Sequence, residues 1–419
     1  MRSSTLPLAC AVFLSIAIAG ATLSISRLSY RAPSSDHLQL LYEDERLGCG
    51  LHRRRTPACP RTKPSPRLND NATRVTAYDR KNYVFNMTIG SEGRAFEVLL
   101  DTGSGLFWLT SSECNTSTCF VNPEYHHERR QFDPTSSSSF RAYKWPVTHQ
   151  YGKGNVSGYM GTDDINIGGV RLEDQDVGMI TNMTQMNGSL FDGIAGLSFP
   201  RVHPDHPFSI LERLQFTIRL FTVYLRFPTA TSPDPLVDAG SIVWNSLDGQ
   251  NCEKDIVWRN ATYLDNRTMN QFNFWMVEID DFTFASQSSE RRRNEGGPWD
   301  RCALDTGAEL IRGPPEQVDE YALAHQSTYN NTMGCYPISC NAQLETLTFK
   351  INARNFTVSG EKLIKKFTRG EFAGSCCLLL DSQPQYKEEP DWLLGAPFLQ
   401  EKCTTFDIEK RRVGIASLK

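Results

Sequence analysis

Beyond an apolar run near its N-terminus, the sequence has no further hydrophobic stretch that could span a membrane. Its 12 cysteines form no C-x-x-C pair and no Cys/His spacing typical of zinc sites, so we expect no metal and no other cofactor. Helical patterns are few and brief. These absences argue against a multi-spanning membrane protein, a zinc-binding protein and an alternating βαβ fold.

The N-terminus has one arginine, an apolar run from Leu6 to about Ile18, and small residues in an A-x-A spacing at Ala17 and Ala19. This order predicts a cleaved signal peptide over residues 1–21, and the alternative is a signal anchor that stays in the membrane. The C-terminus carries neither a hydrophobic tail nor a retention signal. We therefore expect no stable membrane anchor.

Asn-x-Ser/Thr sequons are frequent and support the secretory route. They occur at Asn71, Asn86, Asn115, Asn155, Asn182, Asn187, Asn260, Asn266, Asn330 and Asn355. The number of cysteines also fits an oxidising compartment. We expect a glycoprotein that is secreted or reaches an endolysosomal or vacuolar compartment, and we expect no binding to nucleic acid.

Residues 22–73 differ from the rest of the chain in charge. The stretch from Arg46 to Arg67 has seven basic residues and no acidic one, and four prolines interrupt it. Removing residues 1–69 takes away ten basic and four acidic residues and changes the formal net charge from −4 to −10. We interpret this segment as a removable basic prosegment that pairs with body carboxylates near neutral pH and loosens in acid. The alternative is a solvated linker.

The body beyond about Thr73 is rich in predicted strands, and we expect an all-β fold. Short apolar or alternating segments lie between turn residues at Tyr83–Ile89, Phe96–Leu100, Ile165–Ile167, Val177–Ile180, Phe221–Phe227, Ile242–Trp244, Phe274–Ile279 and Leu347–Ile351. The better helical patterns are Phe208–Leu214 and Pro315–Ala324.

The tripeptide Asp-Thr-Gly occurs twice, 204 residues apart, each time behind an apolar run. The copies are VLLDTGSG with Asp101 and CALDTGAEL with Asp305. One copy would be explained as a turn, but two copies in matching contexts favour a functional role. An apolar-apolar-Gly element follows each copy, with Gly196 and Gly395 placed 95 and 90 residues after the aspartates. This repeat predicts two similar lobes, residues 74–230 and 231–419.

Five elements in a fixed order carry a resemblance to a known family: DTGSGLFW, FDPTSSSSF, QYGKGNVSGYMG, FDGIAGL, and CALDTGAEL with its partner WLLGAPFL. Over roughly residues 78–419 the chain resembles the pepsin-like aspartic proteases. The resemblance implies a bilobal all-β fold with an active-site cleft between the lobes. It also implies a monomeric aspartic endopeptidase, made as a zymogen and inhibited by its own prosegment, that cuts protein or peptide substrates at hydrophobic residues.

The resemblance assigns the chemistry to Asp101 and Asp305. Like charges held close together resist double ionisation, so the pair shares one proton, and one carboxyl activates a water while the other polarises the carbonyl. Further residues are expected to support the pair: Thr102 and Thr306 brace the two turns, Gly103 and Gly307 allow close backbone approach, and Ser104 donates to Asp101.

The segment around Tyr151 corresponds to the flap that closes over bound peptide, with the Tyr151 phenol bonded to the indole of Trp108. Core packing of the two rings is the alternative. The remaining predicted substrate contacts are Gly152 and Lys153 in the flap, the apolar side chains Ile194 and Phe274, and Glu309 beside the second motif.

Several positions in or near the expected site depart from the family pattern or bear on it. Ala308 stands where threonine or serine is usual, which removes one hydrogen-bond donor to Asp305 and predicts a pH optimum above that of gastric pepsin. Lys153 and Glu309 either pair with each other or select charged substrate residues. A glycan at Asn155 would obstruct the flap, so we expect that sequon to be unused.

Nine cysteines remain in the body, which leaves an odd number. By resemblance Cys114 bridges Cys119, and Cys340 is the partner of Cys376 or Cys377. Sequence alone does not pair Cys252, Cys302, Cys335 and Cys403, and the odd total implies a free thiol, mixed pairing or a different cleavage point.

Two other function classes remain open. The chain could be a catalytically silent pepsin-fold glycoprotein with a binding or inhibitory role, although retention of both Asp101 and Asp305 argues against it. It could also be an unrelated β-rich adhesion protein, which the five ordered elements oppose.

Overall fold

The structure is a computed structural model, and it describes residues 72–78, 82–120, 128–152, 154–186, 190–198, 209–227, 236–262, 274–284, 300–368, 370–382 and 390–419. All of them belong to one compact unit, Pro66–Lys419. The predicted signal peptide lies outside the described residues, and so does the predicted prosegment except Ala72 and Thr73, which belong to the first strand.

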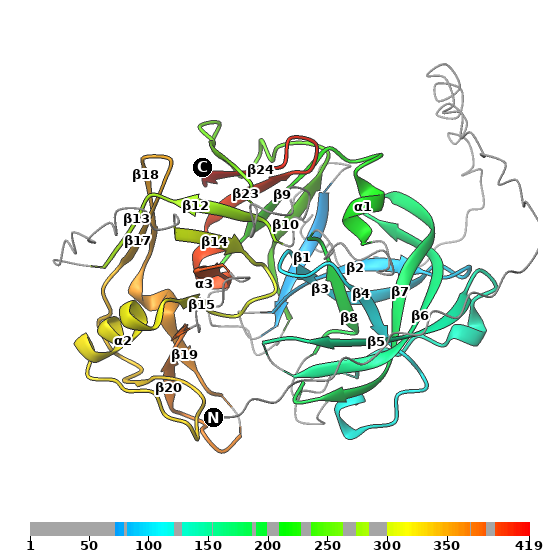
Figure 1. Cartoon of the computed structure of the whole chain (residues 1–419), viewed down its shortest axis with the longest axis horizontal. Coiled ribbons are helices and arrows are strands. Elements are labelled where there is room, and N and C mark those ends of the chain that lie inside the picture. Colours follow the sequence, from blue (N-terminus) through cyan, green and yellow to red (C-terminus); the bar gives the residue numbers. More distant parts are fainter. Residues whose placement is uncertain are drawn as a thin grey trace, which may run out of the picture. The chain divides into compact units, whose positions relative to one another are not determined.

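Strands dominate the described residues, as the sequence predicts (Figure 1). The largest sheet has 13 strands in the order β11-β24-β23-β9-β10-β1-β2-β3-β8-β4-β7-β6-β5. In chain order these are β1 (Ala72–Tyr78), β2 (Asn82–Ile89), β3 (Arg94–Asp101), β4 (Phe107–Thr110), β5 (Arg141–Gln150), β6 (Asn155–Ile167), β7 (Val170–Thr184), β8 (Gly193–Gly196), β9 (Leu220–Leu225), β10 (Leu236–Trp244), β11 (Val257–Asn260), β23 (Lys402–Asp407) and β24 (Arg412–Ser417).

Three smaller sheets lie in the C-terminal half. The first has the order β12 (Met276–Ile279), β14 (Asp300–Leu304), β22 (Trp392–Leu394), β15 (Ile311–Gly313) and β21 (Leu380–Ser382). The second is β13 (Asp281–Phe284), β17 (Leu347–Ile351) and β18 (Arg354–Val358), and the third is β16 (Pro337–Ile338), β20 (Cys376–Leu378) and β19 (Ile364–Lys366). All eight predicted strand segments overlap observed strands.

Helices in the described residues are short: α1 (Ile210–Leu214), α2 (Pro315–Ala324), α3 (Ala396–Leu399) and the 3₁₀ turns η1 (Ser117–Cys119), η3 (Pro134–Ser136) and η4 (Gly360–Leu363). Ser209 starts α1 through a capping box with Glu212. Both predicted helices are therefore present, although Phe208 lies outside the described residues. No helix in the described part of the chain is long and apolar enough to cross a bilayer.

The two Asp-Thr-Gly motifs sit in the same strand arrangement. In the first half β8 lies between β3 and β4, parallel to β3 and antiparallel to β4. In the second half β22 lies between β14 and β15, parallel to β14 and antiparallel to β15. The outer strands repeat as well, because β4 pairs in parallel with β7 and β15 pairs in parallel with β21. The fold is thus β-rich and bilobal, with one repeat unit around each aspartate.

Strand β3 is buried on both faces, which explains its nearly continuous apolar sequence. Phe96, Val98 and Leu100 enter the main core, and Leu99 faces a second cluster that contains Trp108. Burial of each large apolar side chain contributes roughly 1.5–3 kcal/mol. A rigid strand therefore delivers Asp101 to the end of the apolar run.

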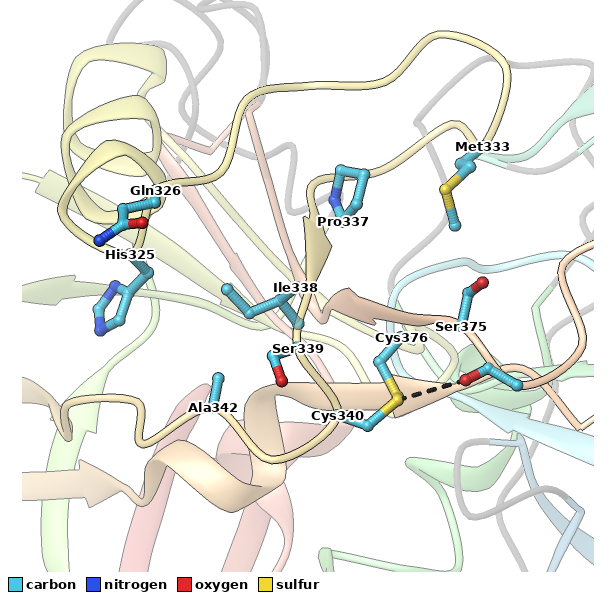
Figure 2. Close-up of a pocket in the computed structure, with 11 residues that line it drawn as sticks. His325, Gln326, Met333, Pro337, Ile338, Ser339, Cys340, Ala342, Ser375 and Cys376 are labelled. Atoms are coloured by element: carbon cyan, nitrogen blue, oxygen red, sulfur yellow. Dashed lines mark hydrogen bonds between the residues drawn. A yellow bond between two sulfur atoms is a disulfide. The ribbon is translucent and has the colours of Figure 1, made fainter.

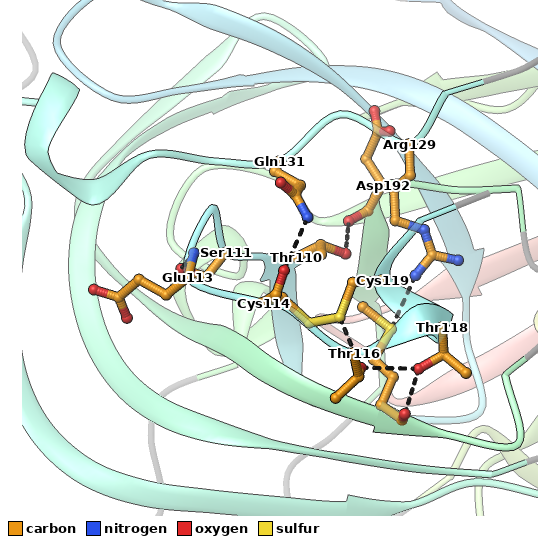
Figure 3. The surroundings of a disulfide bond; sticks show 11 residues. Thr110, Ser111, Glu113, Cys114, Thr116, Thr118, Cys119, Arg129, Gln131 and Asp192 are labelled. Atoms are coloured by element: carbon orange, nitrogen blue, oxygen red, sulfur yellow. Dashed lines mark hydrogen bonds between the residues drawn. A yellow bond between two sulfur atoms is a disulfide. The ribbon is translucent and has the colours of Figure 1, made fainter.

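Asp192, from the FDGIAGL element, holds β8 in place between its neighbours (Figure 3). Its carboxylate accepts the Glu97 N–H of β3 at 2.8 Å, and its carbonyl accepts the Thr110 N–H of β4 at 3.0 Å. The same carboxylate accepts the Arg130 N–H at 2.7 Å. This buried acid fixes the strand that runs beside Asp101.

Four disulfides join described cysteines: Cys114–Cys119, Cys252–Cys403, Cys335–Cys377 and Cys340–Cys376. The first lies beside Thr116 and Thr118 in η1 and the loop before it (Figure 3). Of the two partners predicted for Cys340, the structure selects Cys376. The odd cysteine of the body is Cys302, a buried free thiol in β14.

Candidate active site

The two Asp-Thr-Gly turns are joined across the repeat by four hydrogen bonds. The Thr102 hydroxyl donates to the Leu304 carbonyl and the Thr306 hydroxyl to the Leu100 carbonyl, each at 2.7 Å. The N–H of each threonine donates to the hydroxyl of the other at 3.0 Å. Both threonines are fully buried. Each hydroxyl thus donates once and accepts once, which is the bracing that the resemblance implies.

The braced turns bring the carboxyl groups of Asp101 and Asp305 together. Gly103 N–H donates to Asp101 at 2.9 Å, and Gly307 N–H donates to Asp305 at 2.8 Å. A Cβ atom on Gly103 would lie 2.3 Å from Cγ of Asp305, and one on Gly307 would lie 2.5 Å from Oδ1 of Asp101. Each carboxyl therefore packs against the glycine of the opposite turn, where no side chain fits.

The surroundings of the two carboxyls are unequal. Burial raises the pKa of Asp101, but the Ser104 hydroxyl, which donates to Asp101 at 2.5 Å, counteracts this increase. Burial and then the charge of Asp101 raise the pKa of Asp305 well above its ordinary value. Ala308 supplies a backbone N–H to Asp305 and has no hydroxyl. Asp101 therefore has a hydroxyl donor that Asp305 lacks.

Tyr151 follows β5 in the hairpin that β5 and β6 form. Its N–H donates to the Gly154 carbonyl at 2.9 Å, and the Trp108 indole donates to its hydroxyl at 2.8 Å. Burial and the negative charge of Asp101 raise the pKa of the phenol, so Tyr151 stays protonated beside the aspartate. The centroid of the His149 ring lies 4.5 Å from the centroid of the Tyr151 ring.

The residues predicted to contact substrate differ in burial and in their partners. Ile194 is buried in β8 next to Trp108, and Phe274 is half-buried just before β12. Lys153 lies outside the described residues. Glu309 forms an ion pair with Lys365 at 3.6 Å.

Arg312 is a residue near the flap that sequence reasoning missed. A Cβ atom on Gly152 would lie 2.8 Å from Nη2 of Arg312. The signal was available in the repeat, because Arg312 follows Asp305 by seven residues, as Trp108 follows Asp101. Both positions of the repeat therefore touch the flap, Trp108 through Tyr151 and Arg312 through Gly152.

A pocket of about 570 Å³ lies elsewhere, beside the Cys340–Cys376 disulfide (Figure 2). His325, Met333 and Ile338 contribute to its walls, and no residue of the two Asp-Thr-Gly turns or of the flap does. The pocket lining contains no aspartate or glutamate, so the paired carboxyls lie outside it.

Residues 82–418 match the family described as eukaryotic aspartyl protease. The chain belongs to this family. Among curated relatives, aspartic protease 17 of Caenorhabditis elegans is 26% identical over 363 residues, which cover 85% of this chain and 88% of the relative. Gastricsin of Mus musculus is 28% identical over 350 residues, covering 81% and 82%. Pregnancy-associated glycoprotein 2 of Bos taurus is 26% identical over 368 residues, covering 84% and 87%.

Within this aspartyl protease, the matched region contains both Asp101 and Asp305 and the whole flap segment. Among the described residues, no group of three or more His, Cys, Asp or Glu side chains could hold a metal. The titratable groups gathered at this site are the carboxyls of Asp101 and Asp305 and the neighbouring phenol of Tyr151.

Proposed function

We propose that this aspartyl protease is an active endopeptidase that hydrolyses extended polypeptides, with a preference for hydrophobic residues at the cut. The observation that carries the proposal is the pairing of Asp101 and Asp305, each packed against the glycine of the other turn. Protein interiors do not hold two carboxyls together for stability, because burial and mutual repulsion both oppose it. Such strain is typical of functional sites.

The unequal surroundings of Asp101 and Asp305 suggest which step of hydrolysis each carboxyl performs. Ionised Asp101 takes a proton from water, and the hydroxide oxygen bonds to the peptide carbonyl carbon while Asp305 gives its proton to the carbonyl oxygen. The tetrahedral intermediate then collapses: Asp101 returns its proton to the amide nitrogen, the C–N bond breaks, and Asp305 recovers its proton from a hydroxyl. The Tyr151 phenol limits solvent access on the flap side.

We also propose that the chain is made as a zymogen, with residues 22–73 as an inhibitory prosegment, and that it acts as a monomer. The basic charge of this segment and the acidic body support the first point. The sequons support passage through the secretory pathway to an extracellular or endolysosomal location, because every described sequon asparagine is exposed, at positions 86, 115, 155, 182, 260, 330 and 355.

Acid incubation of the full chain tests this function. We expect the protein to shorten itself at its N-terminus below about pH 5, to cleave a denatured protein, and to stop when a statine-type inhibitor is added. The alternative, a pepsin-fold glycoprotein that only binds, predicts an intact chain and no inhibitor-sensitive cleavage.

A further inference from the structure

Arg312 reaches the flap from the other half of the molecule. It lies in β15, and its Nη2 and Nη1 atoms would be 2.8 and 2.9 Å from a Cβ atom on Gly152. Gly152 directly follows Tyr151, whose phenol lies close enough to Asp101 for the carboxylate to raise its pKa. The guanidinium therefore lies within a few substrate residues of the position that the scissile bond of a bound peptide would occupy.

The hydrogen-bonding capacity of this guanidinium is incompletely used. It forms an ion pair with the carboxylate of Asp381, the neighbour of Arg312 in the parallel pairing of β15 with β21, at 3.9 Å from Nε. That distance is too long for a hydrogen bond. Nε is buried and has no hydrogen-bond partner among the described residues. A half-buried arginine with spare donors is a strong site for a carboxylate, which can bind two N–H groups at once.

Another acid close to Arg312 in the sequence has an ion-pair partner of its own. Glu309, three residues earlier in the chain, is ion-paired with Lys365. The side chain of Arg312 remains 30% exposed, so an incoming group can reach it. Trp108 occupies the position of the first repeat that corresponds to Arg312. Its side chain is fully buried and donates a hydrogen bond to the flap, whereas Arg312 places a positive charge beside the flap.

We propose that Arg312 selects an acidic side chain in the substrate, within about three residues of the scissile bond. The inference rests on the proposed endopeptidase function and gives it a substrate class: extended peptides that carry aspartate or glutamate near a hydrophobic cut. An extended peptide advances about 3.3 Å per residue, so three residues span roughly 10 Å along the cleft from the scissile carbonyl.

Matched peptides test the proposal with the acid-activated full-length protein. Each pair differs only by glutamate or glutamine at one of the three positions on either side of the cut. At one position we expect kcat/KM to be about tenfold higher for glutamate, the effect of one charge-assisted hydrogen-bonded pair. Arg312→Gln should reduce that ratio to about one, and Arg312→Glu should favour lysine there.

Two further variants make the result specific. Arg354→Gln removes an arginine of similar exposure that pairs with Asp255 in the same half, and it should leave the ratio unchanged. Asp381→Asn removes the carboxylate that pairs with Arg312 at 3.9 Å and should raise the ratio, so the proposal stays testable if Arg312 variants do not fold.

The role of Arg312 and the proposed endopeptidase function on which it rests would be overturned by different results. A wild-type protein that cleaves both peptides of every pair equally overturns the role of Arg312 but leaves the endopeptidase intact. Arg312→Gln slowing all peptides alike would show that the arginine only holds the flap, and it would also overturn the inference. If no peptide is cleaved at any acid pH, the proposed function itself fails.

Discussion

At the scale of single residues, Asp101 and Asp305 differ in their hydrogen bonds, and the proposed mechanism depends on this difference. Asp101 receives the Ser104 hydroxyl, and Asp305 has Ala308 at the corresponding place. The pKa of both carboxyls is raised by burial, and that of Asp305 also by the charge of Asp101. Small changes at these two neighbours should therefore move the pH profile of the enzyme.

Ala308→Thr should restore a donor to Asp305. A hydroxyl that stabilises the ionised form lowers its pKa, so the alkaline limb of the kcat/KM profile should move to lower pH by about one pH unit. Ser104→Ala is the matched control: it removes a donor from Asp101, raises its pKa, and should move the acid limb to higher pH. Unmoved limbs in both variants would contradict the assignment.

The raised pKa of Asp305 also predicts a stability effect. The folded state favours the neutral carboxyl, so this residue's contribution to stability is fully present below the unfolded pKa and is lost as pH rises through the folded pKa. Asp305→Asn should therefore raise the melting temperature at pH 7 and change it little at pH 3. An equal change at both pH values in calorimetry would argue against a strained carboxyl pair.

At the scale of elements, the position of the flap depends on the indole of Trp108. Trp108 in β4 donates to Tyr151, and this bond fixes the hairpin of β5 and β6 above Asp101. Trp108→Phe keeps most of the buried ring but removes the donor. We expect kcat/KM to fall about tenfold with less than about 2 kcal/mol of lost stability, measured by peptide hydrolysis and urea unfolding. Activity equal to wild type would mean that the hydrogen bond does not position the flap.

The sequence predicted the elements whose signals are local. Asp101, Asp305 and their threonines come from a motif repeated at the end of two apolar runs, and α2 was predictable because Pro315 suits the first turn of a helix. The repeat makes Arg312 the counterpart of Trp108, but it does not reveal that β15 lies opposite the flap, and for that reason Arg312 was missed. The Glu309–Lys365 pair joins segments 56 residues apart, which no local pattern reveals.

At the scale of the whole molecule, pairing between distant segments holds the two halves together. Strand β9 pairs with β10 and β23, so the largest sheet contains strands from both predicted lobes. The Trp275 indole adds a bond across the repeat, because it donates to the Leu197 carbonyl at 2.8 Å. Sequence alone predicted two lobes but not this shared sheet, since strand pairing over such separations is set by the assembled core.

The disulfides should contribute unequally to stability. Cys252 and Cys403 are 151 residues apart, and Cys114 and Cys119 are five apart. In the loop-entropy account, replacing the first pair by serine should cost about 5 kcal/mol and the second about 2 kcal/mol. Urea unfolding of the two double variants measures this order, and an equal loss would contradict it.

Peptide hydrolysis by the activated protein and by its Asp101→Asn and Asp305→Asn variants tests the role of the carboxyl pair most directly. Each single change should lower kcat by at least about 1,000-fold while the circular dichroism spectrum stays native, because neither carboxyl can act alone. A folded variant that retains a tenth or more of the activity would show that hydrolysis does not depend on the pair.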